Sequence, residues 1–174
     1  DLGISRAMII EEPFAAALGA DLSISEPRGK MVVDIGGGTT DVATISYGEV
    51  VDDITTRAGG NRMNEAIQAF VRENYQLAIG YGEAEALKIE IGNAKFTEYD
   101  KNDKMVVKGR NIATGVPDER IIYAKVVSEA LDEVISMIVT SIKQVLEVTK
   151  PGLSVDIMES GIVLSGGGAL LKRL

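Results

Sequence analysis

The chain has 174 residues, of which 45% are hydrophobic, enough to build the core of one domain or of a compact pair of subdomains. It contains neither cysteine nor histidine, which excludes disulfides, cysteine-ligated metal sites and the side chain most often used as a general base. The formal net charge is −8 with no basic cluster, so we expect neither a nucleic-acid partner nor docking of this segment on an anionic membrane surface.

The first predicted elements are a strand approach, a short helix and three strands. The chain starts without methionine, inside a strand-like segment at residues 4–10, and stops at Leu174 shortly into an apparent helix, so we expect a chain cut from a longer protein. Glu11-Glu12-Pro13 then opens a helix over residues 14–18, because acidic residues and proline favour a first helical turn. Three strands with a turn at Tyr47-Gly48 are predicted over residues 31–35, 41–46 and 50–57. Their short connections require antiparallel neighbours.

The middle of the chain changes to helical periodicity. Apolar residues at helical spacing predict helices over residues 63–71 and 84–94. A hairpin is predicted over residues 96–111, with its turn at Lys101-Asn102-Asp103. We interpret this middle part as an inserted helical and hairpin unit.

The last third combines strand and helix signals. A short strand is predicted over residues 120–123, and the apolar-faced stretch 126–148 is expected to form two helices with a bend. Lys150-Pro151-Gly152 ends that stretch. A buried strand over residues 161–164, a glycine run and the start of a helix close the chain. The fold class is therefore α/β.

A glycine-rich turn between two acidic residues is the first candidate site, with the sequence Asp34-Ile-Gly-Gly-Gly-Thr-Thr-Asp41. Glycines let a phosphate approach the backbone amides closely, and the threonine hydroxyls can donate to phosphate oxygens. Asp34 is a hard oxygen ligand, suited to Mg²⁺ through its water shell. A hairpin turn without a ligand is the alternative interpretation, but an acidic residue in an apolar strand is costly unless it is used.

Three further features each have a structural and a functional interpretation. Residues 161–168 form a strand that runs into a glycine turn, where a flat ligand could lie on bare backbone, although such turns are common. Glu11 and Glu12 most often form a helix N-terminal charge pair. Glu85 and Lys88 are one helical turn apart, so they form either an ordinary ion pair on a solvated face or contacts to a nucleotide.

Together these pieces resemble the superfamily of actins, sugar kinases and DnaK-type chaperones. Its phosphate-binding hairpin matches residues 34–41, its adenosine motif residues 164–168, and its hinge motif residues 12–17. Within the superfamily the chain is most similar to the bacterial actins MreB and Mbl, in the stretches 10–20, 31–41, 84–92, 107–111 and 161–171.

The resemblance implies an actin-type fold with two lobes around ATP or ADP and Mg²⁺, of which this chain is the second. Residues 1–20 would be an inter-lobe strand and connector helix. Residues 21–58 and 136–174 would form a ribonuclease-H-like subdomain, IIA. Residues 59–135 would form an inserted smaller α+β subdomain, IIB.

The resemblance also implies roles for individual residues. Glu12 would orient or activate the attacking water, with Thr39 and Asp41 near that water and the γ-phosphate. Asp34 would hold the hydration shell of Mg²⁺. The nucleotide would contact Gly36, Gly37, Gly38, Thr39, Gly60, Glu85, Lys88, Gly166, Gly167 and Gly168. One departure is that Asn61 and Asn64 stand where relatives usually carry acidic residues, which makes the cleft locally less acidic.

The function implied is that of an ATP-binding cytoskeletal protein that assembles head to tail with copies of itself and contributes to cell shape. It would lie in the cytoplasm, and the intact protein would associate with the membrane and with other cell-shape proteins. The intact protein would be a slow ATPase, and this chain alone would be essentially inactive, since half of the phosphate cradle belongs to the first lobe. A DnaK-type ATPase domain or sugar kinase of the same fold, and an interaction module that binds no nucleotide, are the alternatives.

Overall fold

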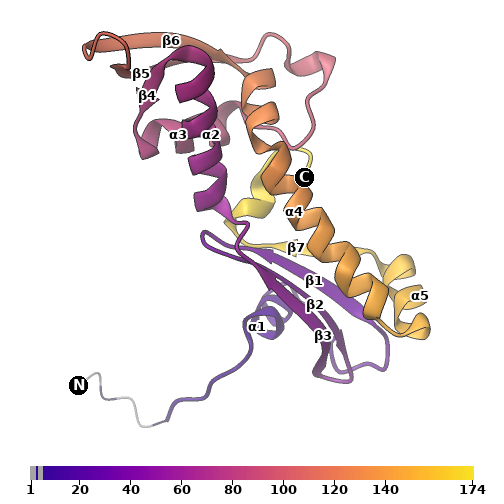
Figure 1. The fold of residues 1–174 in the computed structure, drawn as a ribbon. Helices are drawn as coiled ribbons and strands as arrows, with labels where there is room; N and C mark the ends of the chain where they lie inside the picture. The colour runs from indigo at the N-terminus through magenta and orange to yellow at the C-terminus, as the bar shows by residue number, and fades with distance from the viewer. Residues whose placement is uncertain (1–2, 4–5) are drawn as a thin grey trace.

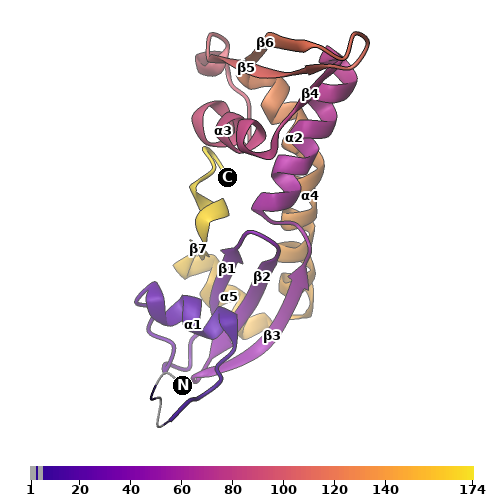
Figure 2. The ribbon, with the colours of Figure 1, turned by 90° about the vertical axis from the view of Figure 1, so that its left-hand side faces the viewer.

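Two β-sheets and a long helix define the architecture in the computed structural model, which describes residue 3 and residues 6–174. The four-stranded sheet has the order β3-β2-β1-β7, formed by β1 (Lys30–Ile35), β2 (Thr40–Ser46), β3 (Glu49–Thr56) and β7 (Ile162–Ser165). The three-stranded sheet has the order β4-β5-β6, formed by β4 (Leu77–Ile79), β5 (Lys104–Asn111) and β6 (Pro117–Tyr123). The sheets lie at opposite ends of an elongated molecule, and α4 (Ala124–Val148) runs along its length (Figures 1 and 2).

Local sequence accounts for the first three strands. β1 pairs with β2 and β2 with β3 in antiparallel register, as their short connections predict. Tyr47 and Gly48 both have positive φ, 53° and 75°, which a two-residue hairpin turn requires. β7 adds to the other edge of β1 in parallel register. This last pairing brings a strand from the first quarter of the chain and the last strand into one sheet.

Helices cover the sheets and connect the two ends. The α-helices besides α4 are α1 (Glu12–Gly19), α2 (Gly60–Tyr75), α3 (Tyr81–Ile91) and α5 (Pro151–Ser160). Two short 3-10 helices are η1 (Glu98–Asp100) and η2 (Gly167–Leu170). Helix α1 packs on the face of the four-stranded sheet opposite to α4, as Figure 1 shows.

The core follows the apolar stripe of α4. Its buried residues recur every three or four positions and include Val127, Leu131, Val134, Ile138 and Val145. The first half of α4 contacts α2, α3 and β6, and the second half contacts β2 and β3. One continuous hydrophobic cluster therefore spans both ends of the molecule. A smaller cluster lies under α1.

The strand predicted at the start of the chain is absent from the described residues 6–10. Residues 4 and 5 of that prediction lie outside the described part. Met8 and Ile9 are almost fully exposed. An isolated extended segment is not a strand, because ladder hydrogen bonds need a neighbouring strand, and no described strand lies beside residues 6–10.

Two other predictions for single elements were wrong. Residues 126–148 do not bend into two helices but belong to the single helix α4, which contains neither proline nor glycine. Residues 96–111 are not a hairpin. Their first part contains η1, and only residues 104–111 form a strand, which pairs with β4 and β6 on either side. The sequence reading also missed the short strand β4 and helix α5.

The proposed division into subdomains remains a prediction, although two observations bear on it. The junction of residues 58 and 59 falls between β3 and α2, where the chain passes from one end of the molecule to the other. The return junction, at residues 135 and 136, falls inside α4, which is continuous there. In the described part of the chain, no helix has both the length and the apolar character needed to cross a membrane.

Candidate functional site

A cavity of about 390 Å³ lies between the two ends of the molecule. Its walls come from the turn after β1, the start of α2, helix α3, and the segment that follows β7. These segments are far apart in the sequence. Seven residues predicted to contact a nucleotide line the cavity: Gly36, Gly37, Gly60, Glu85, Lys88, Gly167 and Gly168. The volume is within the usual range of about 300–1,000 Å³ for small-molecule sites.

The turn between β1 and β2 carries glycines that the fold itself does not require. The Gly36 N–H donates to the Thr39 carbonyl at 2.9 Å, which closes the turn. None of the three glycines, Gly36 to Gly38, has a positive φ. A Cβ atom added at Gly38 would meet no atom within 4 Å, and one at Gly37 would lie 3.5 Å from the Asn61 Oδ1 atom. Bare backbone here leaves room for an approaching ligand.

The start of α2 is docked on this turn through backbone hydrogen bonds. The Gly60 N–H donates to the Gly36 carbonyl at 2.9 Å, and the Asn61 N–H donates to the Gly37 carbonyl at 2.8 Å. A Cβ atom added at Gly59 would lie 2.7 and 2.8 Å from the Gly37 and Gly36 carbonyl oxygens. Glycine at position 59 is therefore what allows the two backbones to approach.

The second glycine run packs on the end of β1. Gly166 has a φ of 81°, and a Cβ atom there would overlap the Ile35 carbonyl and lie 2.6 Å from the Asp34 Oδ1 atom. A Cβ atom at Gly168 would overlap the Ile35 side chain, whereas one at Gly167 would meet nothing within 4 Å. Packing thus explains the glycines at 166 and 168, and of the three only Gly167 and Gly168 line the cavity.

Polar side chains form a row across the four-stranded sheet where β1 ends. The register places Asp34 opposite Asp41 on β2 and opposite Ser165 on β7, and it places Asp41 opposite Thr55 on β3. The Thr55 hydroxyl donates to the Asp41 carboxylate. Two carboxylates directly opposite each other repel, so this pair is suited to a cation between or above them.

This row fits Mg²⁺ held partly by water and phosphate rather than a site built from protein ligands alone. Among the described residues, no group of three or more acidic, histidine or cysteine side chains could hold a metal ion. Mg²⁺ typically keeps several waters and takes only one or two carboxylates beside substrate phosphates. Asp34 and Asp41 lie outside the lining of the cavity itself.

Glu85 and Lys88 of α3 face the cavity. The Lys88 ammonium donates to the Gly60 carbonyl at 3.2 Å, which connects α3 to the start of α2. In the described part of the chain the two side chains form no salt bridge, so the simple ion pair considered from the sequence is not observed. Burial lowers the pKa of Lys88, and the nearby Glu85 carboxylate partly opposes this effect.

The predicted catalytic residues are not gathered in the cavity. Glu12 is exposed at the first residue of α1, next to the exposed N-cap residue Glu11. Thr39 is half-buried in the turn after β1, and Asp41 is buried at the start of β2. Neither they nor Glu12 line the cavity.

Other residues that line the cavity were not predicted to contact a nucleotide, although Asn61 had been noted as a departure from the family pattern. Asn61 accepts a hydrogen bond from the Tyr81 hydroxyl at 2.7 Å, which connects α2 to α3. Ile89, Leu170 and Lys172 also line the cavity. Ile89 lies one residue after Lys88 on α3, and Leu170 and Lys172 directly follow the second glycine run. The proximity of these residues to the predicted motifs is the sequence signal from which their place in the cavity could have been predicted.

Comparison with known proteins identifies the same family over the whole length of the chain. A family model described as MreB/Mbl protein matches residues 1–174. The cell shape-determining protein MreB of Escherichia coli (strain K12) is 48% identical over 172 residues, which are 99% of this chain and 49% of that protein. The chain therefore spans about half the length of this relative.

Solved structures show the same fold. MreB5 of Spiroplasma citri bound to ADP has a TM-score of 0.93 at 38% identity, covering 98% of this chain and 51% of that one. The same protein bound to AMPPNP has a TM-score of 0.90 at 38% identity, covering 95% and 49%. The MamK filament structure has a TM-score of 0.68 at 26% identity, covering 93% and 47%. The fold is actin-like, and the chain belongs to the MreB/Mbl family of cell shape-determining proteins.

Proposed function

We propose that this chain is the second nucleotide-binding lobe of a filament-forming, actin-like protein that contributes to cell shape. The observation that carries the proposal is the shared cavity, which is lined by two glycines from each glycine run and by Glu85 and Lys88. MreB5 of Spiroplasma citri, 38% identical, has been solved with ADP and with AMPPNP. Together these support an adenine nucleotide as the ligand.

The nucleotide would lie with its phosphates over the bare backbone of Gly36 to Gly38. Lys88, Glu85 and Gly60 would contact the ribose and base, with Gly166 to Gly168 behind the adenosine. A bound Mg²⁺ would neutralise phosphate charge, and Asp34 would hold it through its water shell. The side-by-side carboxylates of Asp34 and Asp41 support a cation at this place.

Hydrolysis would be slow and would require the intact protein. By the resemblance to the family, Glu12 would orient the attacking water, a part that a carboxylate can play. Thr39 and Asp41 would position that water and the terminal phosphate. Phosphoryl transfer depends on donors preorganised around the transferred group, and this chain supplies one of two phosphate loops. The chain alone is therefore expected to show almost no turnover.

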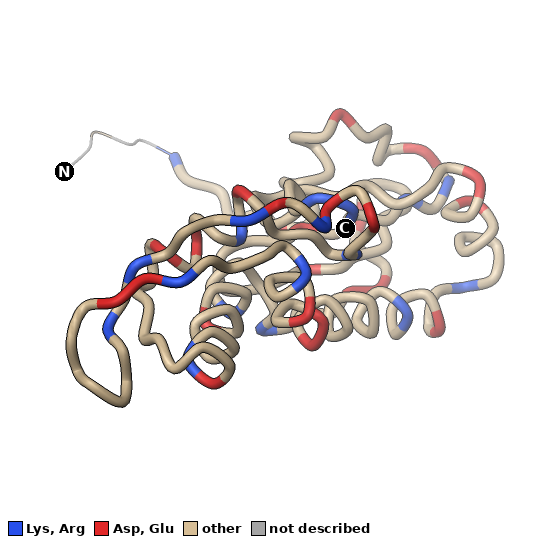
Figure 3. The backbone as a smooth tube through the Cα atoms, turned by 90° about the horizontal axis from the view of Figure 1, so that it is seen from above, with Lys and Arg blue, Asp and Glu red and all other residues tan. Residues whose placement is uncertain are grey.

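Self-association into head-to-tail filaments is the proposed assembly, and the MamK filament, 26% identical, supports it. Lys and Arg positions are interspersed with Asp and Glu along the elements seen in Figure 3, and the net charge is −8. This distribution favours protein partners over nucleic acid. We place the protein in the cytoplasm, with membrane association and contacts to other cell-shape proteins contributed by the intact molecule.

A DnaK-type chaperone domain or a sugar kinase was the alternative within the same superfamily. The family match over residues 1–174 and the 48% identity to a cell shape-determining protein favour the cytoskeletal function. An interaction module that binds no nucleotide is the remaining alternative. Nucleotide binding separates it from our proposal.

The test is a titration of ATP and ADP, with Mg²⁺, into the intact protein and into this chain alone. Gly38→Ala is the informative variant, because its methyl group would meet no protein atom within 4 Å and, on our proposal, would stand where the phosphates lie. Gly152→Ala is the matched control, since its Cβ atom also meets nothing within 4 Å and it lies on α5, away from the cavity.

We expect Gly38→Ala to weaken ATP binding about tenfold or more, equivalent to about 1.4 kcal/mol, at an unchanged midpoint of thermal unfolding. Gly152→Ala should bind like the parent. If the intact protein binds neither nucleotide, the chain is an interaction module. If Gly38→Ala binds as tightly as the parent, the phosphates do not lie on this turn.

A further inference from the structure

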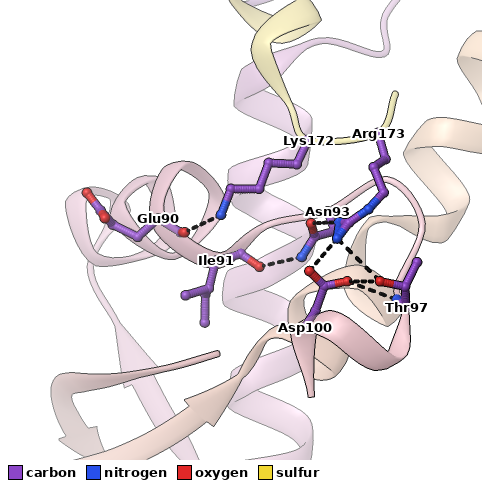
Figure 4. Close-up of polar contacts among 7 residues, drawn as sticks. All are labelled: Glu90, Ile91, Asn93, Thr97, Asp100, Lys172 and Arg173. Atoms are coloured by element: carbon purple, nitrogen blue, oxygen red, sulfur yellow. Dashed lines mark hydrogen bonds and ion pairs between the residues drawn. The ribbon is translucent and has the colours of Figure 1, made fainter. Parts of the chain in front are cut away.

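Lys172 and Arg173 fasten the segment after β7 to the opposite end of the molecule (Figure 4). The Ala94 N–H donates to the Lys172 carbonyl at 2.8 Å, and Lys172 forms a parallel bridge with Asn93. The Lys172 ammonium donates to the Glu90 carbonyl, in the last turn of α3, at 2.9 Å. Backbone and side chain of one residue are thus both committed to this contact.

Arg173, whose side chain is 35% exposed, adds a polar network with the buried residues Asn93 and Asp100 to the same contact. Its guanidinium donates to the Asn93 Oδ1 atom at 2.6 Å and pairs with the Asp100 carboxylate. The N–H and hydroxyl of Thr97 donate to the other Asp100 oxygen at 2.9 and 2.7 Å. The Asn93 side chain is fully buried and donates to the Ile91 carbonyl at 3.0 Å. We call Lys172, Arg173, Asn93, Thr97 and Asp100 the clasp.

The clasp differs from an ordinary surface ion pair in two respects. The Asp100 side chain is only 6% exposed, and a buried carboxylate is costly without a partner. Arg173 has a φ of 59°, in the left-handed region of the backbone that residues other than glycine and asparagine rarely adopt. Such a conformation persists only when the surrounding contacts hold it.

The position of the clasp relates it to the cavity. One wall is the segment with Gly167, Gly168 and Lys172, and the facing wall is α3, with Glu85 and Lys88. The clasp joins the last turn of α3, and the residues just after it, to the end of the glycine segment. On another side, the turn after β1 is joined to α2 by two backbone hydrogen bonds. The cavity is therefore held by two separate fastenings.

We infer that Arg173 is a positioning residue, which holds the glycine segment against the α3 side of the cavity and so slows the release of a bound nucleotide. This inference rests on the proposed function, because it needs a nucleotide in the cavity. Loss of the Arg173–Asp100 pair leaves only the Lys172 contacts to hold the end of the segment that carries Gly167 and Gly168 against α3. The wall can then move away from α3, and the ligand leaves faster.

The test measures nucleotide release from the intact protein, by stopped-flow displacement of a fluorescent ATP analogue with excess ATP. The variants are Arg173→Gly, Asp100→Asn and the two combined. Arg173→Gly removes the ion pair while placing at φ 59° the residue best suited to that conformation, so the backbone is not strained. Asp21→Gly is the matched control, because Asp21 also has a positive φ, 56°, and lies outside the cavity.

We expect Arg173→Gly to raise the dissociation rate about tenfold, as the loss of one charge-assisted hydrogen-bonded pair implies, with the association rate unchanged. The double variant should release nucleotide no faster than the faster single variant, and Arg173→Lys should recover part of the slow release. Asp21→Gly should behave as the parent does.

Two results would overturn the inference while leaving nucleotide binding intact. One is a dissociation rate in Arg173→Gly equal to that of the parent. The other is a double variant whose increase in dissociation rate equals the product of the two single increases. Two residues that act as one ion pair are coupled and do not give such a product. If the parent itself binds no nucleotide, the proposed function fails, and the failure is visible before any variant is compared.

Discussion

A methyl group added at Gly59 should push α2 away from the glycine turn that follows β1. In Gly59→Ala the new Cβ atom would lie 2.7 Å from the Gly37 carbonyl oxygen and 2.8 Å from that of Gly36, closer than real Cβ atoms come. Both obstacles are backbone atoms, which cannot rotate away. Gly59 has φ −130° and ψ −171°, an extended conformation open to alanine, so the whole effect is one of crowding.

The magnitude follows from what must separate. The hydrogen bonds Gly60 N–H to Gly36 O, at 2.9 Å, and Asn61 N–H to Gly37 O, at 2.8 Å, would lengthen or break. Two such bonds contribute about 2 kcal/mol and overpacking costs about 1–3 kcal/mol, while the stiffer unfolded chain returns about 0.4–1 kcal/mol. The expected loss of unfolding free energy is about 3 kcal/mol.

Urea unfolding of this chain, followed by far-ultraviolet circular dichroism, measures that loss. Gly60→Ala is the matched control, because its Cβ atom would lie 3.4 Å from the flexible end of Lys88 and no closer to any backbone atom than 3.7 Å. The control should change the unfolding free energy by less than about 1 kcal/mol. A loss below about 1 kcal/mol in Gly59→Ala, or an equal loss in both variants, would refute the reasoning.

Three other predictions concern the intact protein. Asp34→Asn should weaken Mg²⁺-dependent ATP binding in a titration without changing the midpoint of thermal unfolding, and an unfolded variant would show instead that Asp34 is structural. Glu12→Ala should slow single-turnover hydrolysis by about 10²–10⁴-fold while affecting ATP affinity less, and an equal effect in Glu11→Ala would mean that only general N-terminal charge matters. Because burial lowers the pKa of Lys88 below its usual 10.5, its positive charge is lost at a lower pH than in an ordinary lysine. ATP affinity should therefore fall as the pH rises through that pKa, and Lys88→Gln should abolish this dependence, whereas an unchanged profile would exclude a charge contact from Lys88.

Much of the candidate site could be predicted because its motifs are short and local. The acid–glycine–threonine turn and the second glycine run are readable as sequence, and both contribute residues to the observed cavity. The role of each glycine in these motifs could not be predicted from the sequence. Gly38 is free of internal contacts, whereas Gly166 and Gly168 are needed for packing on Ile35. Sequence alone does not distinguish a glycine that serves a ligand from one that serves the fold.

Local pattern also determined most of the elements. The three antiparallel strands follow from alternation and short connections, and the buried face of α4 follows from apolar residues at helical spacing. These features depend on neighbours within a few residues, so the information lies in the sequence itself. The bend expected within residues 126–148 was wrong. The helix holds no proline or glycine that could cause a bend.

Only the tertiary structure decided which distant segments meet. The pairing of β7 with β1 joins residues separated by most of the chain. The contact of Arg173 with Asp100 joins residues separated by nearly half of it. The start of the chain shows the converse, because residues 7–10 are apolar and strand-like in composition but have no described strand beside them. A strand or a clasp needs a partner, and the choice of partner depends on the packing of the whole chain rather than on the segment itself.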